Sequence, residues 1–583
     1  MIRNKASRKL IKGERTSVIM VVFFVLGGLA IGRLFYLQIV CHSGYQEESL
    51  GQHQLERELL QSRGEIFMHD YKNNTLVPLV VNRDMGLLFI VPKEIMDKEK
   101  TAKALAEILE SDEQKRAELM AEILGKAGKP GDPYEPIKHK VEPEIIQKIE
   151  ELKLPGVYFE NELVRYYPEK EGAGQLTGFL GFTGEGQVGQ YGLEGYFEKY
   201  LAGERGRILA DKDVAGRLIT ATEKELKEAE DGIDIVLTVD RVVQSKAYEF
   251  IKEATEASEA QSGVIIVVEP LTGRIQALAG YPSFDPNNYG QVEDIKYYRN
   301  AAVSEAYEPG SIFKIITMSA GLDSGAVQAE DTFVDTGETR IGPDVIRNAD
   351  NKKYGQVNMA GILENSINNG TIFVAKKTSR EVFKKYVESF GFGEPTGIEL
   401  TGEATGNINS LDEKREIYLA TASFGQGLTV TPIQMAAAFS TIVNNGRLIK
   451  PRLVDYLKKD GQETGADNVQ GEQIISQRTA EIIKAMMVSV VKNGQAKRAQ
   501  IPGYNIGGKT GTAQIAEPGA AGYSENTNHS FIAFGPMEDP RFAIVVKLSK
   551  PQRRWAESTA IPPTVKMVNF LLQYYQIPPE NQN

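Results

Sequence analysis

The residues best suited to chemistry are a serine and a lysine three positions apart, Ser311 and Lys314. Pro309 and Gly310 interrupt the preceding chain, and the apolar run that begins at Ile312 predicts a helix starting near the serine. Residues at i and i+3 share a helix face, so the amine can reach the hydroxyl and act as its base. For this role the lysine pKa must fall from about 10.4 to near 7, which burial or a nearby cation achieves. A Ser-x-x-Lys pair alone more often marks a solvated helix face, so other motifs must support the chemistry.

A second candidate segment contains Ser366 and Asn368, two positions apart after a predicted helix end. On such a loop both side chains can face a cleft, where the hydroxyl relays a proton and the amide binds a substrate amide. An ordinary helix stop explains the same residues, because serine and asparagine are frequent where helices end. The segment therefore gains weight only in combination with other motifs.

The third segment reads Lys-Thr-Gly-Thr from Lys509. On a strand, Lys509 and Gly511 share one face, while Thr510 and Thr512 share the other. Glycine lets another backbone approach closely, and an edge strand can pair with an extended peptide. Lys509 offers a cation for a substrate carboxylate, and its charge would depress the pKa of Lys314. The alternative is a solvated lysine in a glycine-rich turn.

Predicted strands lie on both sides of a long helical stretch, residues 311–487. The pattern of apolar residues predicts a hairpin before this stretch and an antiparallel meander after it. The strands are expected over residues 264–268, 275–279, 505–513, 529–534 and 541–548. Two strands before a helical block and three after it predict one five-stranded antiparallel sheet built from both ends of a domain. With helices on the faces of that sheet, the fold class is α/β (α+β).

The chain begins with a basic segment and a long apolar segment, residues 16–40. Its first 17 residues carry no charge, and 17 to 25 apolar residues are enough to span a membrane. A buried core helix and a cleaved signal peptide are the alternatives. No Ala-x-Ala site follows, and Val40 stands before Cys41 where a lipoprotein signal needs a small residue. The basic residues before the span place residues 1–15 in the cytoplasm and the rest outside the cytoplasmic membrane.

Composition narrows the function classes further. The chain has 583 residues, which predicts two to four domains, and its formal net charge is −11. Because residues 1–15 are basic, the remainder is still more acidic, which argues against nucleic acid as a partner. The single cysteine excludes an internal disulfide framework, and five scattered histidines argue against a structural zinc site.

Residues 41–230 predict a separate region of mixed helices and strands. Apolar residues recur at helical spacing over 101–126, a short helix is expected over 143–152, and 154–168 predicts strand and turn. Residues 184–189 match the Gly-x-Gly-x-x-Gly pattern of dinucleotide-binding sites. That fingerprint needs a strand directly before it and a βαβ unit around it, which this segment lacks. The glycines are therefore expected to form tight turns.

Ser-x-x-Lys, Ser-x-Asn and Lys-Thr-Gly follow one another in a single domain, a combination characteristic of penicillin-binding proteins and class A β-lactamases. The chain resembles a class B, monofunctional penicillin-binding protein over nearly its whole length. Ile367 takes the position of the aspartate in the middle motif, as is common in high-molecular-weight members, and one departure is Gln175, where relatives often carry histidine. The latter affects packing of the N-terminal region and not the chemistry. Further similar segments span residues 63–66, 189–194, 201–206, 237–240, 282–287, 308–314, 424–427 and 509–514.

The resemblance implies a peptidoglycan D,D-transpeptidase that cross-links stem peptides through a serine acyl-enzyme. It implies that Ser311 attacks the carbonyl of the penultimate D-Ala of a stem pentapeptide and that Lys314 takes the serine proton. Ser366 is then expected to help carry that proton to the leaving D-Ala, and Asn368 to hold the peptide. β-Lactams are expected to acylate Ser311 and remain attached.

The same resemblance assigns substrate binding to the third motif. Lys509 and Thr510 are expected to bind the terminal carboxylate, and the strand with Gly511 to align the donor peptide. The backbone N–H groups of Ser311 and Thr512 are expected to form the oxyanion hole. No cofactor is implied.

The resemblance also predicts the organisation and partners of the chain. It implies a membrane glycosyltransferase and cell-wall or divisome proteins as partners, and the Ser-Ile-Asn motif with the tail 574–579 favours the division type over the elongation type. A β-lactamase or carboxypeptidase is disfavoured by the long N-terminal region and the anchor. A β-lactam sensor is disfavoured by the short cytoplasmic portion. The expected parts are a cytoplasmic tail 1–15, a transmembrane anchor 16–40, a non-catalytic pedestal domain of the dimerisation type 41–230, a transpeptidase domain 231–577 and a tail 578–583.

Overall fold

The computed structural model describes residues 10–41, 54–59, 61–129, 131–184, 186–211, 225–465, 471–517 and 522–579. The chain divides into two units, which are described separately. One unit combines residues 1–62 with 203–231, and the other combines residues 63–202 with 232–583.

The smaller unit contains the apolar helix α1 (Leu10–Phe35), which continues as a π-helical turn over Tyr36–Val40. Among the described residues, 16–40 form the one helix long and apolar enough to cross a membrane, and almost all of its side chains are exposed. The predicted apolar span is therefore present as a continuous helix. The remaining described strands of this unit form an antiparallel sheet in the order β1 (Gln54–Leu59), β8 (Gly206–Asp211) and β9 (Glu225–Lys227).

In the larger unit, a seven-stranded sheet joins sequence regions on both sides of the predicted boundary at residue 231. Strand β10 (Asp234–Asp240) pairs in parallel with β2 (Ile66–Asp70) and antiparallel with β18 (Val454–Lys459). Strand β10, expected to begin the C-terminal domain, therefore lies between a strand from the N-terminal region, β2, and a strand from the C-terminal region, β18. The other strands are β3 (Thr75–Ile90), β4 (Glu135–Val141), β5 (Val157–Tyr166) and β19 (Gln462–Gly465).

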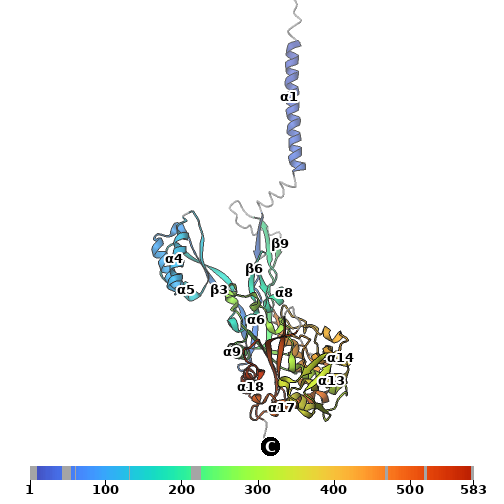
Figure 1. Cartoon of the computed structure of the whole chain (residues 1–583). Helices are drawn as coiled ribbons and strands as arrows, with labels where there is room; N and C mark the ends of the chain where they lie inside the picture. Colours follow the sequence, from blue (N-terminus) through green and yellow to red (C-terminus); the bar gives the residue numbers. More distant parts are fainter. Residues whose placement is uncertain are drawn as a thin grey trace, which may run out of the picture. The chain divides into compact units, whose positions relative to one another are not determined.

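Three helices gather at the far end of β3 (Figure 1). Helices α3 (Lys98–Leu109), α4 (Glu113–Ala127) and α5 (Pro143–Glu151) enclose a separate small core that includes Leu88 and Ile123. The apolar pattern over 101–126 is therefore two helices and not one. The break occurs because the Asp112 carboxylate accepts a hydrogen bond from Lys115 N at 3.0 Å and caps α4. The short helix and the strand expected after it are confirmed as α5 and β5.

The glycine-rich segment around residue 186 forms a hairpin, as expected from its turn residues. Strands β6 (Phe179–Thr183) and β7 (Gly186–Gln190) pair antiparallel, while Glu185 of the predicted turn lies outside the described residues. Gly192 has φ +46°, and a Cβ there would lie 2.3 Å from Gly178 N, so this position requires glycine. Short helices flank the hairpin: α6 (Gly174–Thr177), α7 (Gly192–Tyr196) and α8 (Glu198–Leu201).

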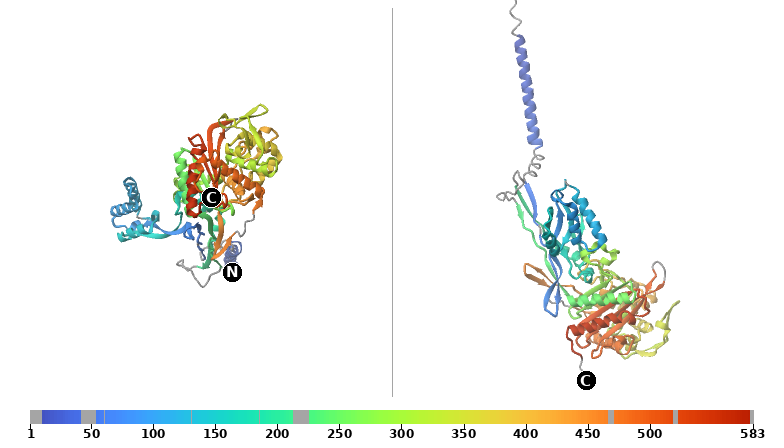
Figure 2. Two further views of the ribbon diagram at one scale, coloured as in Figure 1. Left: turned by 90° about the horizontal axis from the view of Figure 1, so that it is seen from below. Right: turned by 90° about the vertical axis from the view of Figure 1, so that its left-hand side faces the viewer.

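The predicted five-stranded antiparallel sheet is confirmed, with strand order β12-β11-β23-β22-β21. Pairing of β11 with β23 joins the two ends of the domain, and Figure 2 shows the green and red strands side by side. Strand β21 lies at the edge, so one side of its backbone has no partner strand in the described part of the sheet. The bounds are β11 (Ser262–Val268), β12 (Ile275–Tyr281), β21 (Gly507–Ala516), β22 (Tyr523–Gly535) and β23 (Phe542–Ser549).

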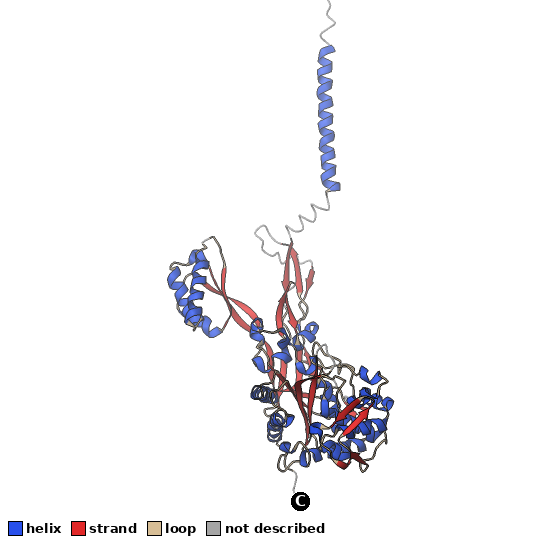
Figure 3. Ribbon diagram, in the orientation of Figure 1, coloured by secondary structure: helices blue, strands red, loops and turns tan. Residues whose placement is uncertain are grey.

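Helices cover both faces of this sheet (Figure 3). Helices α9 (Arg241–Ala257) and α18 (Ile561–Tyr574) pack together on one face, and α11 (Lys314–Asp323), α16 (Pro432–Val443) and α17 (Gln477–Lys492) pack together on the other. The expected helical stretch also contains short hairpins that the sequence pattern did not indicate. The further helices are α10 (Ala301–Ser304), α12 (Met359–Glu364), α13 (Asn368–Thr378), α14 (Arg380–Ser389) and α15 (Glu416–Ala422); the short strands are β13 (Thr332–Asp335), β14 (Glu338–Ile341), β15 (Asp344–Arg347), β16 (Gly355–Asn358), β17 (Arg447–Leu448) and β20 (Glu472–Gln473).

Candidate active site

Ser311 lies in a 3₁₀ turn, Gly310–Phe313, that leads directly into α11, so the predicted helix start is confirmed. Gly310 has φ +58°, and its N–H donates to Gly425 O at 2.9 Å. A Cβ on Gly425 would lie 2.3 Å from Gly310 O, so two glycines allow these backbones to meet. The Ser311 side chain is half-buried and makes no hydrogen bond to the part of the chain that the structure describes.

Lys314 is fully buried and faces the second motif. Its Nζ donates to Ser366 O at 2.6 Å and to Asn368 Oδ1 at 2.7 Å, and lies 3.3 Å from Ser366 Oγ. The asparagine amide is held in turn, because its Nδ2 donates to Arg347 O at 3.0 Å. The first two motifs therefore meet at the lysine amine.

Ser366 lies between the end of α12 and the start of α13, as the predicted helix stop requires. Its φ is +53°, a conformation that is unfavourable for a residue with a Cβ and that is often retained at functional sites. In this conformation Ser366 Oγ also accepts a hydrogen bond from Lys509 Nζ at 3.0 Å. One hydroxyl thus lies within 3.3 Å of two lysine amines.

The third motif lies on edge strand β21, beside the turn that carries the serine. A Cβ on Gly511 would lie 3.0 Å from Pro309 O, and a Cβ on Gly310 would lie 2.8 Å from the Ala513 Cβ. Lys509 and Thr510 are buried, whereas Thr512 is half-buried. The structure therefore brings all three predicted motifs together around one side of the 310–313 turn.

Burial sets the charge state of the two lysines. It lowers the pKa of Lys509 to about 7. The pKa of Lys314 is held well below its ordinary value by burial first and by the nearby Lys509 charge second. The depression expected for a lysine base is therefore present, with both predicted causes.

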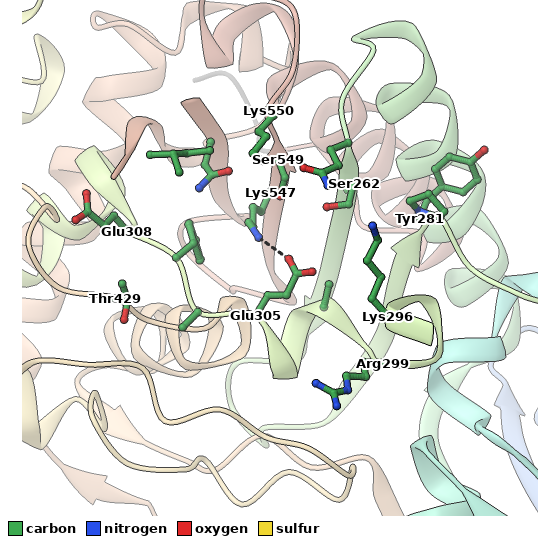
Figure 4. Close-up of a pocket in the computed structure, with 18 of the residues that line it drawn as sticks. Ser262, Tyr281, Lys296, Arg299, Glu305, Glu308, Thr429, Lys547, Ser549 and Lys550 are labelled. Carbon is green, nitrogen blue, oxygen red and sulfur yellow. Dashed lines mark hydrogen bonds and ion pairs between the residues drawn. The ribbon is translucent and has the colours of Figure 1, made fainter. Parts of the chain in front are cut away.

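Sequence reasoning missed one cluster next to this site. A cleft of about 350 Å³ is lined by Glu308, three residues before Ser311, and by Lys547 and Glu305, whose ion pair is drawn in Figure 4. A lysine in the middle of the apolar strand β23 was the available signal, because buried strands seldom carry an unpaired charge. Among the described residues, no group of three or more His, Cys, Asp or Glu side chains is arranged to hold a metal ion.

Two family models match the chain, the penicillin-binding protein dimerisation domain over residues 60–237 and the penicillin binding protein transpeptidase domain over residues 263–568. Stage V sporulation protein D of Bacillus subtilis is 33% identical over 529 residues, which cover 89% of this chain and 79% of that protein. The probable peptidoglycan D,D-transpeptidase PenA of Neisseria meningitidis is 30% identical over 97% of this chain and 94% of its own length. Peptidoglycan D,D-transpeptidase FtsI of Escherichia coli is 29% identical over 90% of this chain and 85% of its own length.

Solved structures share the fold. Penicillin-binding protein 3 of Mycobacterium tuberculosis, in complex with aztreonam, superposes with a TM-score of 0.68 at 23% identity, covering 90% of this chain and 98% of that one. A peptidoglycan synthetase from Bifidobacterium adolescentis superposes with a TM-score of 0.69 at 26% identity, covering 91% of this chain and 98% of that one.

An antiparallel sheet that gathers these three motifs defines a serine acyl-transfer enzyme of the penicillin-binding type. The chain belongs to the class B penicillin-binding proteins and is a peptidoglycan D,D-transpeptidase that forms a serine acyl-enzyme and binds β-lactams. With its apolar N-terminal helix it is a membrane-anchored protein.

Proposed function

We propose that Ser311 is the nucleophile and Lys314 its base. The observation that carries this assignment is the buried Lys314 amine, with its lowered pKa, beside the Ser311 turn and bonded to the Ser366–Asn368 segment. A neutral amine can accept the hydroxyl proton, whereas an ammonium cannot. The depressed pKa therefore matches the role.

Acylation then proceeds as an addition and an elimination. Ser311 Oγ bonds to the carbonyl carbon of the penultimate D-Ala while its proton passes to Lys314. The bond between that carbon and the nitrogen of the terminal D-Ala breaks, and the proton returns through Ser366 to the leaving amine. Ser366 Oγ suits this relay because it lies within 3.3 Å of Lys314 Nζ. Asn368 binds a peptide amide beside it.

The third motif binds the donor peptide. Lys509 and Thr510 bind the terminal carboxylate, and the open edge of β21 at Gly511 pairs with the extended peptide. The N–H groups of Ser311 and Thr512 stabilise the oxyanion, and losing one such donor raises the barrier by about 3–4 kcal/mol in measured cases. A neutral amine of a second stem peptide next attacks the acyl-ester carbon, the bond between that carbon and Ser311 Oγ breaks, and one amine proton passes through Lys314 to Ser311 Oγ, which completes the cross-link and restores the free serine.

Labelling with a fluorescent penicillin tests this assignment. We expect wild type to form a covalent adduct, Ser311→Ala to form none, and Ser324→Ala to label like wild type. Ser324 is a matched control because it caps the C-terminal end of α11, and its hydroxyl donates to Ala320 O at 2.6 Å. An adduct mapped by mass spectrometry to another residue would overturn the assignment.

We also propose that the enzyme serves cell division, with a membrane glycosyltransferase and divisome proteins as partners. The Ser-Ile-Asn motif and the C-terminal tail support this choice, as does the likeness to FtsI. A fluorescent fusion is expected to collect at the septum, and depletion to give filaments. Lateral-wall localisation with rounding of depleted cells would favour an elongation role instead.

The proposed topology places residues 1–15 in the cytoplasm and the pedestal domain 41–230 and transpeptidase domain 231–577 outside, with 578–583 as a tail. Cys41 offers a direct probe, because it is the single cysteine of the chain and is partly exposed at the end of the apolar helix. A membrane-impermeant maleimide is expected to label Cys41 in intact spheroplasts. The double variant Cys41→Ser/Ser7→Cys is expected to react only after permeabilisation, and the reverse pattern would invert the topology.

A further inference from the structure

The cleft beside the Ser311 turn extends away from the reacting residues. It begins at Glu308 and Thr429 and includes Gln514 and Ala516, which lie on β21 just beyond Thr512. Its other wall is formed where the ends of β11, β12 and β23 meet, and Figure 4 shows Lys296, Arg299, Lys547 and Lys550 around this end. The strand that aligns the donor peptide therefore leads into a basic cleft.

Lys547 is the most unusual residue in the cleft. It projects from the central strand β23, is 3% exposed, and lies 4.9 Å from the centre of the Tyr307 ring. Its Nζ donates to Glu305 Oε2 at 3.2 Å. An ammonium has three N–H donors and this bond uses one, so the group retains capacity for an anionic ligand. Burial lowers its pKa, and a bound carboxylate would favour its charged form.

The other cations of the cleft are accessible. Arg299 and Lys550 are exposed, and neither forms an ion pair with the part of the chain that the structure describes. Lys296 pairs with Asp294 at 2.7 Å. The cations outnumber the two carboxylates of the cleft lining, Glu305 and Glu308. The cleft is thus suited to an anion, with the cations gathered away from Glu308.

Gln175 and Tyr307 contribute polar groups to the cleft lining. Gln175, which lines the cleft, donates its Nε2 to Pro282 O at 2.8 Å and to Tyr297 O at 3.2 Å, so its amide is held in one orientation. The buried Gln175 Oε1 and Tyr307 Oη have no hydrogen-bond partner among the described residues. A buried polar atom without a partner is costly, and two such atoms belong to residues of this one cleft lining.

The direction of the donor identifies the ligand. When the terminal carboxylate of the donor lies at Lys509 and Thr510, its preceding residues extend along β21 towards Gln514 and the cleft. We propose that this cleft binds a carboxylate on the part of the donor stem peptide distal to the scissile bond, through Lys547, Arg299 and Lys550. The inference rests on the proposed function, because it takes the donor orientation from the assignment of the third motif.

Two matched donors test the proposal on the full-length enzyme. They are acyl-D-Ala-D-Ala peptides that differ only in a distal carboxylate or its carboxamide. Wild type is expected to favour the carboxylate donor by about 10-fold in kcat/KM for acylation, the size of one charge-assisted hydrogen bond. The double variant Arg299→Ala/Lys550→Ala and the variant Lys547→Met are expected to lose this preference. Arg478→Ala, an exposed cation on α17, is the control and is expected to retain it.

Penicillin supplies the reference reaction, because it acylates Ser311 without a distal peptide. The Arg299→Ala/Lys550→Ala variant is expected to react with penicillin as fast as wild type does. If wild type itself forms no penicillin adduct, the proposed function is contradicted as well as this inference. Equal rates for the two donors with wild type would overturn the inference. The inference would also be overturned if the Arg299→Ala/Lys550→Ala variant were acylated by both donors at the wild-type rates but transferred the acyl group more slowly to an acceptor amine. The cleft would then bind the acceptor and not the donor. If Lys547→Met fails to fold, the exposed Arg299 and Lys550 pair still decides the question.

Discussion

Lys509 Nζ donates a hydrogen bond of 3.0 Å to Ser366 Oγ, although 143 residues separate the two in sequence. The same oxygen lies 3.3 Å from Lys314 Nζ. Because both amines are fully buried, the hydroxyl is the polar group through which they can exchange a proton. The middle motif thus connects the base of the first motif to the carboxylate-binding residue of the third.

Removing this hydroxyl tests the connection. Ser366→Ala and Ser366→Gly are both expected to slow acylation by penicillin by about 10²-fold or more, the usual size of a lost proton-transfer group. The two variants should differ in stability. Alanine retains the unfavourable φ of +53°, whereas glycine adopts it freely, so the free energy of unfolding of Ser366→Gly is expected to exceed that of Ser366→Ala by about 1 kcal/mol. Equal labelling rates in wild type and both variants would remove Ser366 from the relay.

Replacing Lys509 by methionine is expected to move the pH dependence of acylation. The Lys509 charge lowers the pKa of Lys314, so its removal raises that pKa, and the neutral amine then forms at higher pH. The rising limb of the rate against pH should shift upward, and the rate itself should fall because the β-lactam carboxylate loses its cation. Stability should not fall, since folding already disfavours the charged form of Lys509, whose pKa is about 7. Stopped-flow measurement of the acylation rate from pH 6 to 10 tests this. If the rising part of the profile does not shift, the charge of Lys509 does not affect the pKa of Lys314.

The sequence predicted the parts of this site better than their connections. Each motif is short and local, so a helix start at Ser311, a helix stop before Ser366 and a glycine-rich strand at Lys509 follow from residue type alone. The five-stranded sheet was predictable because its apolar strands flank one helical block. The hydrogen bonds between motifs were not, since each depends on how remote elements pack.

The missed features share one physical reason. Lys547 is buried on the central strand and its amine pairs with Glu305, which is 242 residues away in sequence. The parallel pairing of β10 with β2 joins residues about 170 positions apart, and nothing in either strand specifies its partner. The left-handed backbone of Ser366 is imposed by the helices on both sides of it and is unfavourable for serine itself. Such tertiary constraints have no local sequence signature.

His529 is expected to make the protein acid-sensitive. Both ring nitrogens contact hydroxyls, Thr527 Oγ1 at 3.0 Å and Thr559 Oγ1 at 2.8 Å, and burial lowers its pKa to about 4. The unfolded chain, with a histidine pKa near 6.5, binds the proton more readily, so stability is lost as pH falls from about 6.5 to about 4. The loss is at most about 3 kcal/mol. The melting temperature of His529→Gln should depend less on pH over this range than that of wild type. If the melting temperatures of both proteins fall in parallel, other groups cause the loss of stability.

A buried ion network is expected to stabilise the N-terminal part of the larger unit. Glu194 is fully buried and accepts from Arg63 Nη2 at 2.5 Å and Arg165 Nε at 2.7 Å. Glu194→Ala leaves two arginines without their carboxylate and should cost about 3–5 kcal/mol. Glu122→Ala, which removes the exposed carboxylate of an ion pair with the half-buried Lys126, should cost less than about 1 kcal/mol. Thermal unfolding of the full-length protein in detergent compares them, and similar shifts would contradict the role given to burial.

Gly511→Ala tests whether the contact between β21 and the serine turn positions the nucleophile. The added Cβ would lie 2.5 Å from Ser530 Oγ and 3.0 Å from Pro309 O. A serine side chain can rotate away, but the Pro309 carbonyl is backbone two residues before Ser311, so relieving that contact moves the nucleophile. We expect penicillin acylation to fall by about 10- to 100-fold, because small misplacements of reacting groups carry such costs.

Two further variants separate this explanation from simple crowding of the sheet. Gly125→Ala on α4 meets no atom within 4 Å and should leave labelling unchanged while raising stability by about 0.5–1 kcal/mol. The double variant Gly511→Ala/Ser530→Ala removes the serine contact and retains the contact with Pro309. If it remains slow, the backbone before Ser311 is the constraint, and the glycine of the third motif is required because it allows the nucleophile turn to approach the edge strand. Full recovery of the acylation rate in the double variant would instead assign the effect to Ser530 and leave the position of Ser311 independent of β21.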